Sequence, residues 1–199
     1  MCQMSFILVE KFEREIAKFY GAPYSVAVDS CTHGLEICLR LLQPSRILIP
    51  KRTYLSVAFL GLKLGIKWEW KDDNWKDYYY LGGTNIIDAA VLWKENSYIS
   101  NTLMCLSFQY KKHLNLGRGG MILTDDKISY KKLKKMSYDG RDFDIPWRNQ
   151  NINTIGYHYY MTPETAKLGL EKLPHAKKRK PKKWDITDWP DLTKMDIFK

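Results

Sequence analysis

The chain has 199 residues, of which 45% are hydrophobic and 27% are charged, and its formal net charge is +10. These values are typical of one globular domain with a full core, and they exclude collagen-like, low-complexity and wholly disordered chains. No apolar stretch approaches the roughly 20 residues that a bilayer span needs. The first 20 residues offer no small-residue cleavage site, so no signal peptide is indicated and we expect a cytoplasmic protein.

The positive charge is concentrated near the C-terminus. Residues 172–183 hold seven Lys or Arg and no acid, which leaves about +3 for the rest of the chain. Because Pro174 and Pro181 interrupt this run, we interpret residues 174–199 as an exposed basic tail. Such a tail can contact a phosphate backbone, so nucleic-acid binding is an alternative, although the core carries no recognition motif. A second basic cluster, residues 131–135, is typical of the solvent face of an amphipathic helix.

The cysteines are scattered. Cys2, Cys31, Cys38 and Cys105 form no C-x-x-C pair and have no histidine at a metal-ligand spacing. We therefore expect reduced, mostly buried thiols, with neither a disulfide framework nor a metal site.

Helices alternate with apolar strands through the first two thirds of the chain. Hydrophobic periodicity predicts helices over residues 6–20, 35–42, 54–64, 127–138 and 162–173. Short apolar runs predict strands over residues 24–28, 46–50, 66–70, 85–89, 103–108 and 119–124. Residues 71–80 are charged and aromatic and fit no element. The alternation favours an α/β domain with a mostly parallel sheet flanked by helices.

Polar residues lie where the first predicted strands end. Residues 30–34 read Ser-Cys-Thr-His-Gly and precede a helix, where hydroxyls and free amides can hold a phosphate. Simple helix capping by Ser30 or Thr32 is the alternative. Asp88 ends another strand, and a carboxylate there needs a cationic partner. A helix cap or a structural ion pair is the alternative to a role in binding. Tyr54 follows a third strand and could cover a flat ligand.

Residues 107–120 are the most informative segment. A strand ends at Ser107, Lys111 and Lys112 follow, and a glycine-rich turn at residues 117–120 returns the chain to a strand. A lysine held beside a pocket can have its pKa lowered and form a Schiff base. An ordinary basic loop is the alternative.

The order of these segments resembles the pyridoxal-phosphate-dependent DegT/DnrJ/StrS aminotransferases, which act mostly on keto groups of nucleotide-linked sugars. The agreement is collinear from about residue 12 to residue 173. The matching motifs are Ser30-Cys31-Thr32, Pro50-x-x-Thr53-Tyr54, Asp88-Ala89-Ala90, and Ser107-Phe108-x-x-x-Lys112 followed by Gly117-x-Gly119-Gly120. The resemblance implies an aspartate-aminotransferase-like large domain of PLP fold type I, shortened to residues 1–173. It also implies a role in polysaccharide biosynthesis.

The resemblance further implies roles for individual residues. Lys112, five positions before Gly117, would form the internal aldimine with pyridoxal 5'-phosphate (PLP) and then move protons. Sugar dehydratases of the family carry histidine at this place, so Lys112 favours transamination. Asp88 would pair with the pyridinium nitrogen and Tyr54 would stack on the ring. The phosphate ligands would be Cys31, Thr32, Ser107 and, across a homodimer interface, His158.

Other positions depart from the family pattern. Val91 stands where the family usually has Gln or His, Arg118 replaces a Glu, and His158 and Tyr160 replace an Asn and an Arg. The family's C-terminal small domain has no counterpart in the basic tail. Two hypotheses follow: a minimal homodimeric sugar aminotransferase, with glutamate as the expected amino donor, or a catalytically inactive remnant with a binding or structural role.

Overall fold

The computed structural model describes the backbone of residues 2–199 and the side chains of residues 6–199. The side chain of Cys2 therefore lies outside the described residues. The helices are α1 (Cys2–Tyr20), α2 (Cys31–Leu42), α3 (Leu55–Leu64), α4 (Lys127–Ser137), α5 (Pro163–Lys178) and the short 3-10 helices η1 (Trp147–Asn149), η2 (Ile186–Asp188), η3 (Leu192–Lys194) and η4 (Asp196–Phe198). The strands are β1 (Tyr24–Val28), β2 (Arg46–Pro50), β3 (Lys67–Lys71), β4 (Tyr79–Tyr80), β5 (Ile86–Asp88), β6 (Leu103–Ser107) and β7 (Gly120–Thr124).

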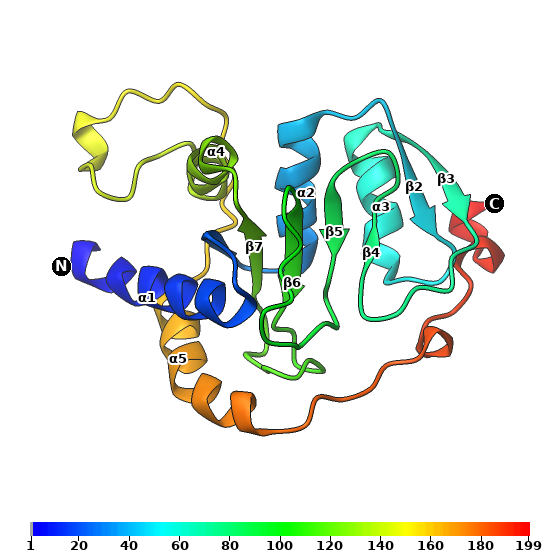
Figure 1. Ribbon diagram of the computed structural model, residues 1–199. Coiled ribbons are helices and arrows are strands. Elements are labelled where there is room, and N and C mark those ends of the chain that lie inside the picture. The colour runs from blue at the N-terminus through cyan, green and yellow to red at the C-terminus, as the bar shows by residue number, and fades with distance from the viewer. Residues whose placement is uncertain (1) are drawn as a thin grey trace.

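The central sheet has the order β1-β7-β6-β5-β4, and helices cover both of its faces (Figure 1). Only the β5–β6 pair within it is parallel, because β7 runs antiparallel to both β1 and β6, and β4 runs antiparallel to β5. The α/β class is as predicted, but the expectation of a mostly parallel sheet is wrong. The connection over residues 81–85 is too short for the crossover that a parallel pair needs. The loop over residues 108–119 folds back on itself, with backbone hydrogen bonds from Phe108 to Gly119 and from Tyr110 to Gly117, and so returns the chain antiparallel.

A second, parallel pair of strands, β2 and β3, continues the sheet beyond β4. The backbone amide of Leu48 donates to the carbonyl of Gly82, and the amide of Gly82 donates back to Leu48. A Cβ at Gly82 would lie 2.6 Å from the Cβ of Leu48, so this close approach requires glycine. Residues 71–80, for which the sequence predicted no element, therefore contain β4, and the turn that follows β4 joins the two groups of strands.

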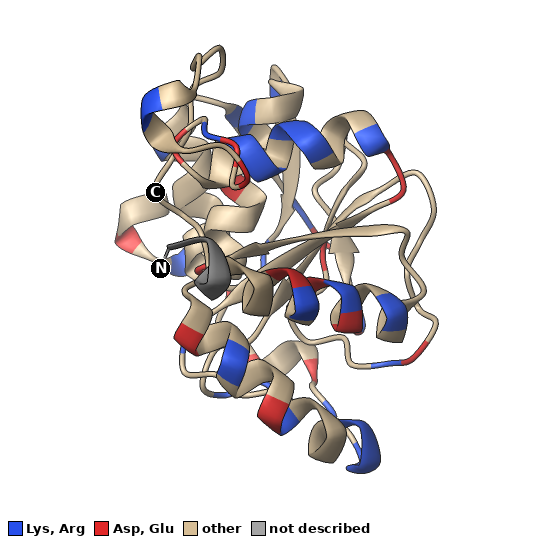
Figure 2. Cartoon of the chain, turned by 90° about the vertical axis from the view of Figure 1, so that its left-hand side faces the viewer, with Lys and Arg blue, Asp and Glu red and all other residues tan. Residues whose placement is uncertain are grey.

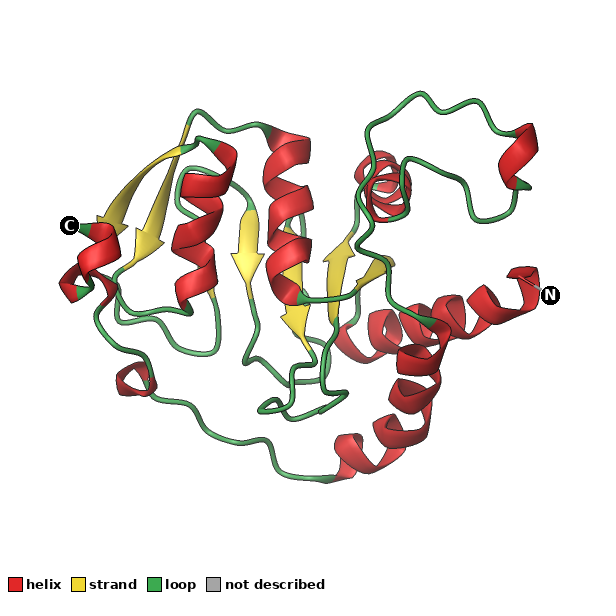
Figure 3. Ribbon diagram, turned by 180° about the vertical axis from the view of Figure 1, so that it is seen from behind, coloured by secondary structure: helices red, strands yellow, loops and turns green. Residues whose placement is uncertain are grey.

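Two hydrophobic clusters fill the space above and below the sheet, so the strands are buried on both faces. Strand β6 shows the division: Met104 and Leu106 face the cluster formed with α1 and α5, whereas Leu103 and Cys105 face the cluster formed with α2, α3 and α4. Seen from behind, α2 and α3 lie on the near side of the sheet and run alongside the strands (Figure 3). Cys31, Cys38 and Cys105 are buried free thiols, as expected.

The basic helix α4 presents Lys131 and Lys132 to solvent, as its pattern predicts (Figure 2). Lys134 differs, because its Nζ lies 2.9 Å from Oε2 of the buried Glu13 on α1. Burial raises the pKa of Glu13, although Lys134 and the amide of Ala27 oppose the shift. This lysine therefore ties α4 to α1 and does not contribute to a free cationic face.

The C-terminal segment is not a free tail. Helix α5 continues past the predicted end at Leu173 to Lys178 and tolerates Pro174, because buried Leu173 and Ala176 pack its last turns into the core. From there the chain runs below the lower ends of the strands and ends beside β3 (Figure 1). Residues 180–183 are exposed, but Leu192 is fully buried. In the described part of the chain, no helix is both long enough and apolar enough to cross a membrane.

Candidate active site

A cavity of about 500 Å³ lies where strands β5 and β6 end and helices α2 and α3 begin. Side chains converge at such a place because strand ends and helix N-termini share one edge of an α/β sheet. Six of the seven residues predicted from the sequence line this cavity, and they are Cys31, Thr32, Tyr54, Asp88, Ser107 and Lys112. The structure thus brings together positions spread over 82 residues of the chain.

Asp88 is the buried carboxylate of the site. Its Oδ2 accepts a hydrogen bond from the Tyr79 hydroxyl at 2.5 Å, and its Oδ1 accepts one from the amide of Ala90 at 3.0 Å. Burial raises the pKa of Asp88, while the hydrogen bonds from Tyr79 and Ala90 and the positive charge of Lys112 oppose that shift. The surroundings therefore hold a carboxylate ready to pair with a cationic group in the cavity.

Tyr79 is a functional residue that sequence reasoning missed. Its hydroxyl lies 2.5 Å from Thr53 Oγ1 as well as 2.5 Å from Asp88 Oδ2, so it links the end of β2 to the end of β5. Burial, then the charge of Asp88, raises the pKa of Tyr79 well above its ordinary value, which keeps the hydroxyl protonated as a donor. The aromatic run at residues 78–80 was the only available signal, and its pairing partner was not evident.

Two lysines line the cavity, Lys111 and Lys112, and Lys112 is the more buried of them. Backbone hydrogen bonds from Phe108 to Gly119 and from Tyr110 to Gly117 hold its loop, and Lys112 is half-buried whereas Lys111 is exposed. Burial lowers the pKa of Lys112, and the charge of Asp88 acts in the opposite direction. A lysine with a lowered pKa has a larger fraction of neutral, nucleophilic amine at a given pH.

The first turn of α2 offers an anion site. The Ser30 side chain caps the helix by accepting from the amide of His33, while the amides of Cys31 and Thr32 have no intrahelical acceptor. Thr32 Oγ1 lies 2.7 Å from Ser56 Oγ at the start of α3, so Ser56 adds a hydroxyl that was not predicted. A Cβ at Gly120 would lie 2.5 Å from the carbonyl carbon of Ser30, so β7 can support this turn only with glycine there.

The C-terminal segment supplies a wall that was not predicted. Its cavity-lining residues are Trp184, Asp188, Trp189, Pro190, Leu192 and Met195. The backbone carbonyl of Trp189 accepts a hydrogen bond from Arg52 Nη1 at 2.9 Å, which fixes the segment against the loop after β2. The expectation of a solvent-exposed tail over residues 174–199 is corrected here, because aromatic residues interleaved with the basic ones pack onto the domain.

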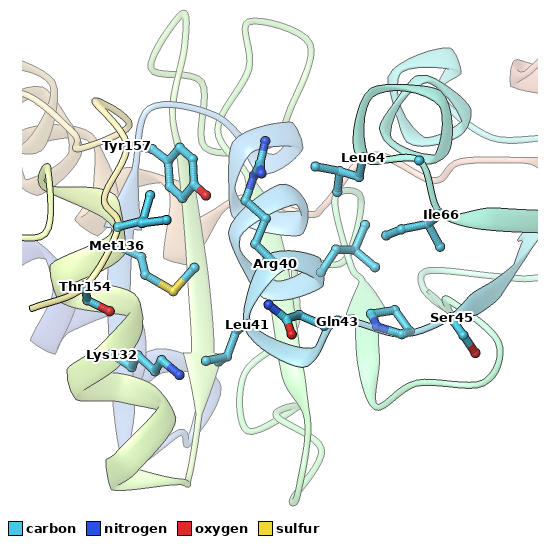
Figure 4. A pocket seen from close by; sticks show the side chains of 14 residues that line it. Arg40, Leu41, Gln43, Ser45, Leu64, Ile66, Lys132, Met136, Thr154 and Tyr157 are labelled. Carbon is cyan, nitrogen blue, oxygen red and sulfur yellow. The ribbon is translucent and has the colours of Figure 1, made fainter.

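A larger cavity of about 630 Å³ lies at the opposite end of α2 (Figure 4). Leu41, Ile66 and Met136 give it apolar walls, and Arg40 and Lys132 add positive charge. None of the predicted site residues lines it. We take the smaller cavity as the candidate active site, because it is lined by the half-buried Lys112, the buried Asp88 and the N-terminus of α2.

The chain matches a known family over most of its length. Residues 5–73 and 98–189 match the DegT/DnrJ/EryC1/StrS aminotransferase family. The chain belongs to this family. The unmatched residues 74–97 include both Tyr79 and Asp88, so the placement of these two side chains rests on the structure.

Solved structures of related fold include members of this family. AtS13 from Actinomadura melliaura is 20% identical, with a TM-score of 0.74 over 86% of this chain and 61% of its own. The sugar aminotransferase CalS13 from Micromonospora echinospora is 15% identical, with the same TM-score and coverage. Spr1654 from Streptococcus pneumoniae, in its PLP form, is 18% identical, with a TM-score of 0.71 over 85% of this chain and 59% of its own. The chain thus spans about three fifths of their length.

A curated relative matches over a shorter stretch. An 86-residue segment is 34% identical to part of the Drosophila melanogaster serine/threonine-protein kinase Warts. The match covers 43% of this chain and 7% of the kinase. This stretch is too short to assign a second family, and the cavity described above is formed by the aminotransferase-like fold.

Among the positions that differ from the family pattern, Arg118 lies at the edge of the cavity. Its Nη2 pairs with Asp29 Oδ2 at 2.8 Å, and Asp29 also contacts His33 Nδ1 at 2.6 Å. The guanidinium therefore adds positive charge next to the first turn of α2. His158 lies outside the cavity, exposed and paired with Asp139 at 3.0 Å. Within one chain the structure does not bring His158 to the other predicted residues.

Proposed function

We propose that this chain is a cytoplasmic, PLP-dependent aminotransferase that acts on a keto group of a nucleotide-linked sugar, with Lys112 as the lysine of the internal aldimine. The observation that supports this proposal most directly is that Lys112 and Asp88 face one cavity from the loop after β6 and the end of β5. A covalently bonding lysine and an acidic partner for the pyridinium nitrogen are the two groups that PLP chemistry requires of a protein.

The remaining residues of the cavity fit the same cofactor. The amides of Cys31 and Thr32 and the hydroxyls of Thr32, Ser56 and Ser107 are suited to a phosphate, in a turn that Gly120 approaches closely. Tyr54 is 55% exposed at the mouth of the cavity, where its ring can cover a flat ligand. When bound, PLP would supply the electron sink for carbon–nitrogen bond chemistry.

The protein's own contribution is to hold and move protons. Lys112 Nζ is the only amine that the cavity buries among the described residues that line it, since Lys111 is exposed. Its lowered pKa allows it to accept and return a proton near neutral pH more readily than an ordinary lysine. Asp88, held by Tyr79, stays in place to pair with a positive ring nitrogen.

The proposed partners follow from family membership. We propose glutamate as the amino donor, a nucleotide-linked keto sugar as the acceptor, and a homodimer in which the exposed His158 contacts the partner's cofactor phosphate. The amino sugar would serve polysaccharide biosynthesis. A non-catalytic, aminotransferase-like binding role is the second candidate, because Val91, beside Asp88 in the cavity region, cannot supply the polar contact that Gln or His supplies in the family.

The test is the visible absorbance of the purified chain after PLP is added, measured beside Lys112→Ala and the matched control Lys111→Ala. We expect a visible band in the wild type and in Lys111→Ala, bleached by glutamate, and no band in Lys112→Ala. A band that forms but does not respond to glutamate or other amino donors would support the binding role. A band that survives in Lys112→Ala would refute the assignment of Lys112.

A further inference from the structure

The C-terminal strap, which we define as residues 179–199, is fixed at its far end. The amide of Leu192 donates to the carbonyl of Lys51 at 2.9 Å, and the Leu192 side chain is fully buried. Phe198 packs on Phe59 and Trp70, with ring centroids 5.4 and 5.5 Å away. The partners lie just after β2, on α3 and on β3, and residues that follow β2 and begin α3 also line the cavity.

Between these anchors and α5, the strap places Trp184 over Lys112. The Nζ of Lys112 lies 4.6 Å from the centroid of the Trp184 ring, and Lys182 Nζ lies 3.7 Å from the same ring. Both distances are within the range of cation–π attraction. The Trp184 ring is thus in contact with the ammonium group of the lysine on which the proposed chemistry depends.

An aromatic series connects this contact to Asp88. Trp184 and Trp189 have ring centroids 5.4 Å apart, and Trp189 lies 4.8 Å from Trp75. Trp75 in turn lies 5.0 Å from Tyr79, whose hydroxyl donates to Asp88. The two charged groups of the site are therefore bordered by one continuous set of rings, half of it contributed by the strap.

We propose that the C-terminal strap forms the outer wall of the Lys112 site, and that Trp184 is a positioning residue that directs Lys112 Nζ into the cavity and shields it from water. The proposal rests on the proposed function in one respect, namely that Lys112 takes part in the cofactor chemistry. The geometry on which it rests concerns only residues of this chain, so it can be tested with no cofactor present.

The charges around Lys112 allow the strap's effect to be predicted. Burial lowers the pKa of Lys112; Asp88 and Cys31 raise it, and Lys182 and Lys111 lower it. Two of the lowering influences, the covering ring of Trp184 and the charge of Lys182, belong to the strap. Loss of the ring also removes a cation–π attraction, but burial is the largest cause of the shift, so removal of the ring should raise the pKa.

The experiment is competitive acetylation of the full chain with acetic anhydride across a range of pH, with the Lys112 peptide quantified by mass spectrometry. It gives an apparent pKa and a limiting rate for Lys112 alone. For Trp184→Ala we expect an upward shift of the midpoint and a several-fold higher limiting rate, because the amine is uncovered. Trp184→Phe should restore both values, since a ring still covers the amine. Lys182→Gln should raise the midpoint and leave the limiting rate unchanged.

Trp147→Ala is the control, because Trp147 is an exposed tryptophan that does not line the cavity. It should leave both values as in the wild type. The proposal is overturned if Trp184→Ala leaves both values unchanged, or if Trp147→Ala reproduces its effect. If circular dichroism shows that Trp184→Ala is unfolded, Lys182→Gln serves as the test instead. In that case an unchanged midpoint for Lys112 acetylation in Lys182→Gln overturns the proposal. Because no PLP is used, these outcomes are independent of the absorbance test above.

Discussion

The hydroxyl of Tyr79 donates to Asp88 Oδ2 at 2.5 Å and lies equally close to Thr53 Oγ1. This contact joins the hairpin of β4 and β5 to the end of β2. It supports Asp88, which is the buried carboxylate among the described residues that line the cavity. Tyr79 lies in the two-residue strand β4, whose sequence, taken alone, indicates no element.

Tyr79→Phe should therefore weaken PLP binding, because it removes only the hydroxyl and keeps the aromatic ring in place. Loss of the hydroxyl removes a hydrogen bond to a charged group, which is worth about 1.5–3 kcal/mol, and leaves Thr53 without this partner. We expect PLP affinity, measured by absorbance titration, to fall about tenfold or more, since each 1.4 kcal/mol is a factor of ten. Tyr80→Phe is the matched control, because the neighbouring Tyr80 is 40% exposed. Equal affinity in wild type and Tyr79→Phe would contradict this role.

Asp88→Asn should make the free protein more stable relative to the wild type as pH rises. Because burial raises the pKa of Asp88 in the fold above 3.8, the stability that its protonated form contributes is present below that value and is lost as pH rises through the folded pKa. Asparagine stays neutral at every pH, so the variant does not lose stability as the pH rises. Urea unfolding of both proteins at acidic and neutral pH measures the difference. A constant difference across this range would mean that Asp88 does not titrate abnormally, while PLP binding should fall in the variant regardless.

Gly120→Ala should damage the anion site through the backbone. The new methyl group would meet Ser30 and the amide nitrogen of Cys31 at 2.5 and 2.6 Å, so the first turn of α2 must move. We expect weaker binding of PLP and of inorganic phosphate by calorimetry. Gly65→Ala is the control, because Gly65 has φ +64 and open space around it and lies away from the cavity. It should cost about 1–2 kcal/mol of stability, because alanine is strained at a left-handed φ, and should leave phosphate binding intact. An equal loss of binding in both variants would point to general destabilisation.

Glu36→Gln should destabilise the fold at neutral pH and matter less in acid. The Glu36 carboxylate is completely buried and accepts from Lys63 at 2.8 Å, Arg40 at 3.0 Å and Tyr159 at 3.1 Å. Burial alone would raise its pKa, but the hydrogen bonds from Lys63 and Arg40 outweigh burial and lower it below 4.5. Its stabilising contribution is therefore present above 4.5 and is lost as pH falls through the folded pKa.

We expect Glu36→Gln to lower the free energy of unfolding by about 2 kcal/mol at neutral pH, the value of a hydrogen-bonded charge. The gap to the wild type should close as the pH falls below 4.5. The control is Glu69→Gln, which removes an exposed ion pair with Arg46 and should change stability by less than about 1 kcal/mol. A Glu36→Gln deficit that persists unchanged in acid would show that packing, not charge, explains the effect.

Much of the site was predictable because its residues follow local patterns. Asp88 and Ser107 end apolar strands, and Cys31 and Thr32 begin a helix behind a serine cap, so sequence spacing alone placed them at one sheet edge. The resemblance to the family, counted back from Gly117, indicated Lys112 rather than Lys111. In the structure Lys112 is half-buried and Lys111 is exposed, and the role of Lys112 stays a prediction.

What the sequence did not reveal depends on long-range contacts. Strand β4 has only two residues and forms through pairing with β5, and strand directions follow from connection lengths rather than from the alternation of helices and strands. The strap was mistaken for a solvated tail because its lysines dominate its composition. Its position is set instead by Trp189 and Leu192, which contact residues more than 100 positions earlier in the chain.

The most direct test of the central claim is to find which lysine PLP modifies. The wild-type chain is incubated with PLP, reduced with borohydride and digested, and the pyridoxyl group is mapped by mass spectrometry. We predict that Lys112 carries the label at near-stoichiometric level and that Lys112→Ala remains unlabelled at low PLP concentration. Labelling centred on Lys111, or spread over the exposed lysines of α4 and residues 177–183, would contradict the assignment of this cavity as a PLP site.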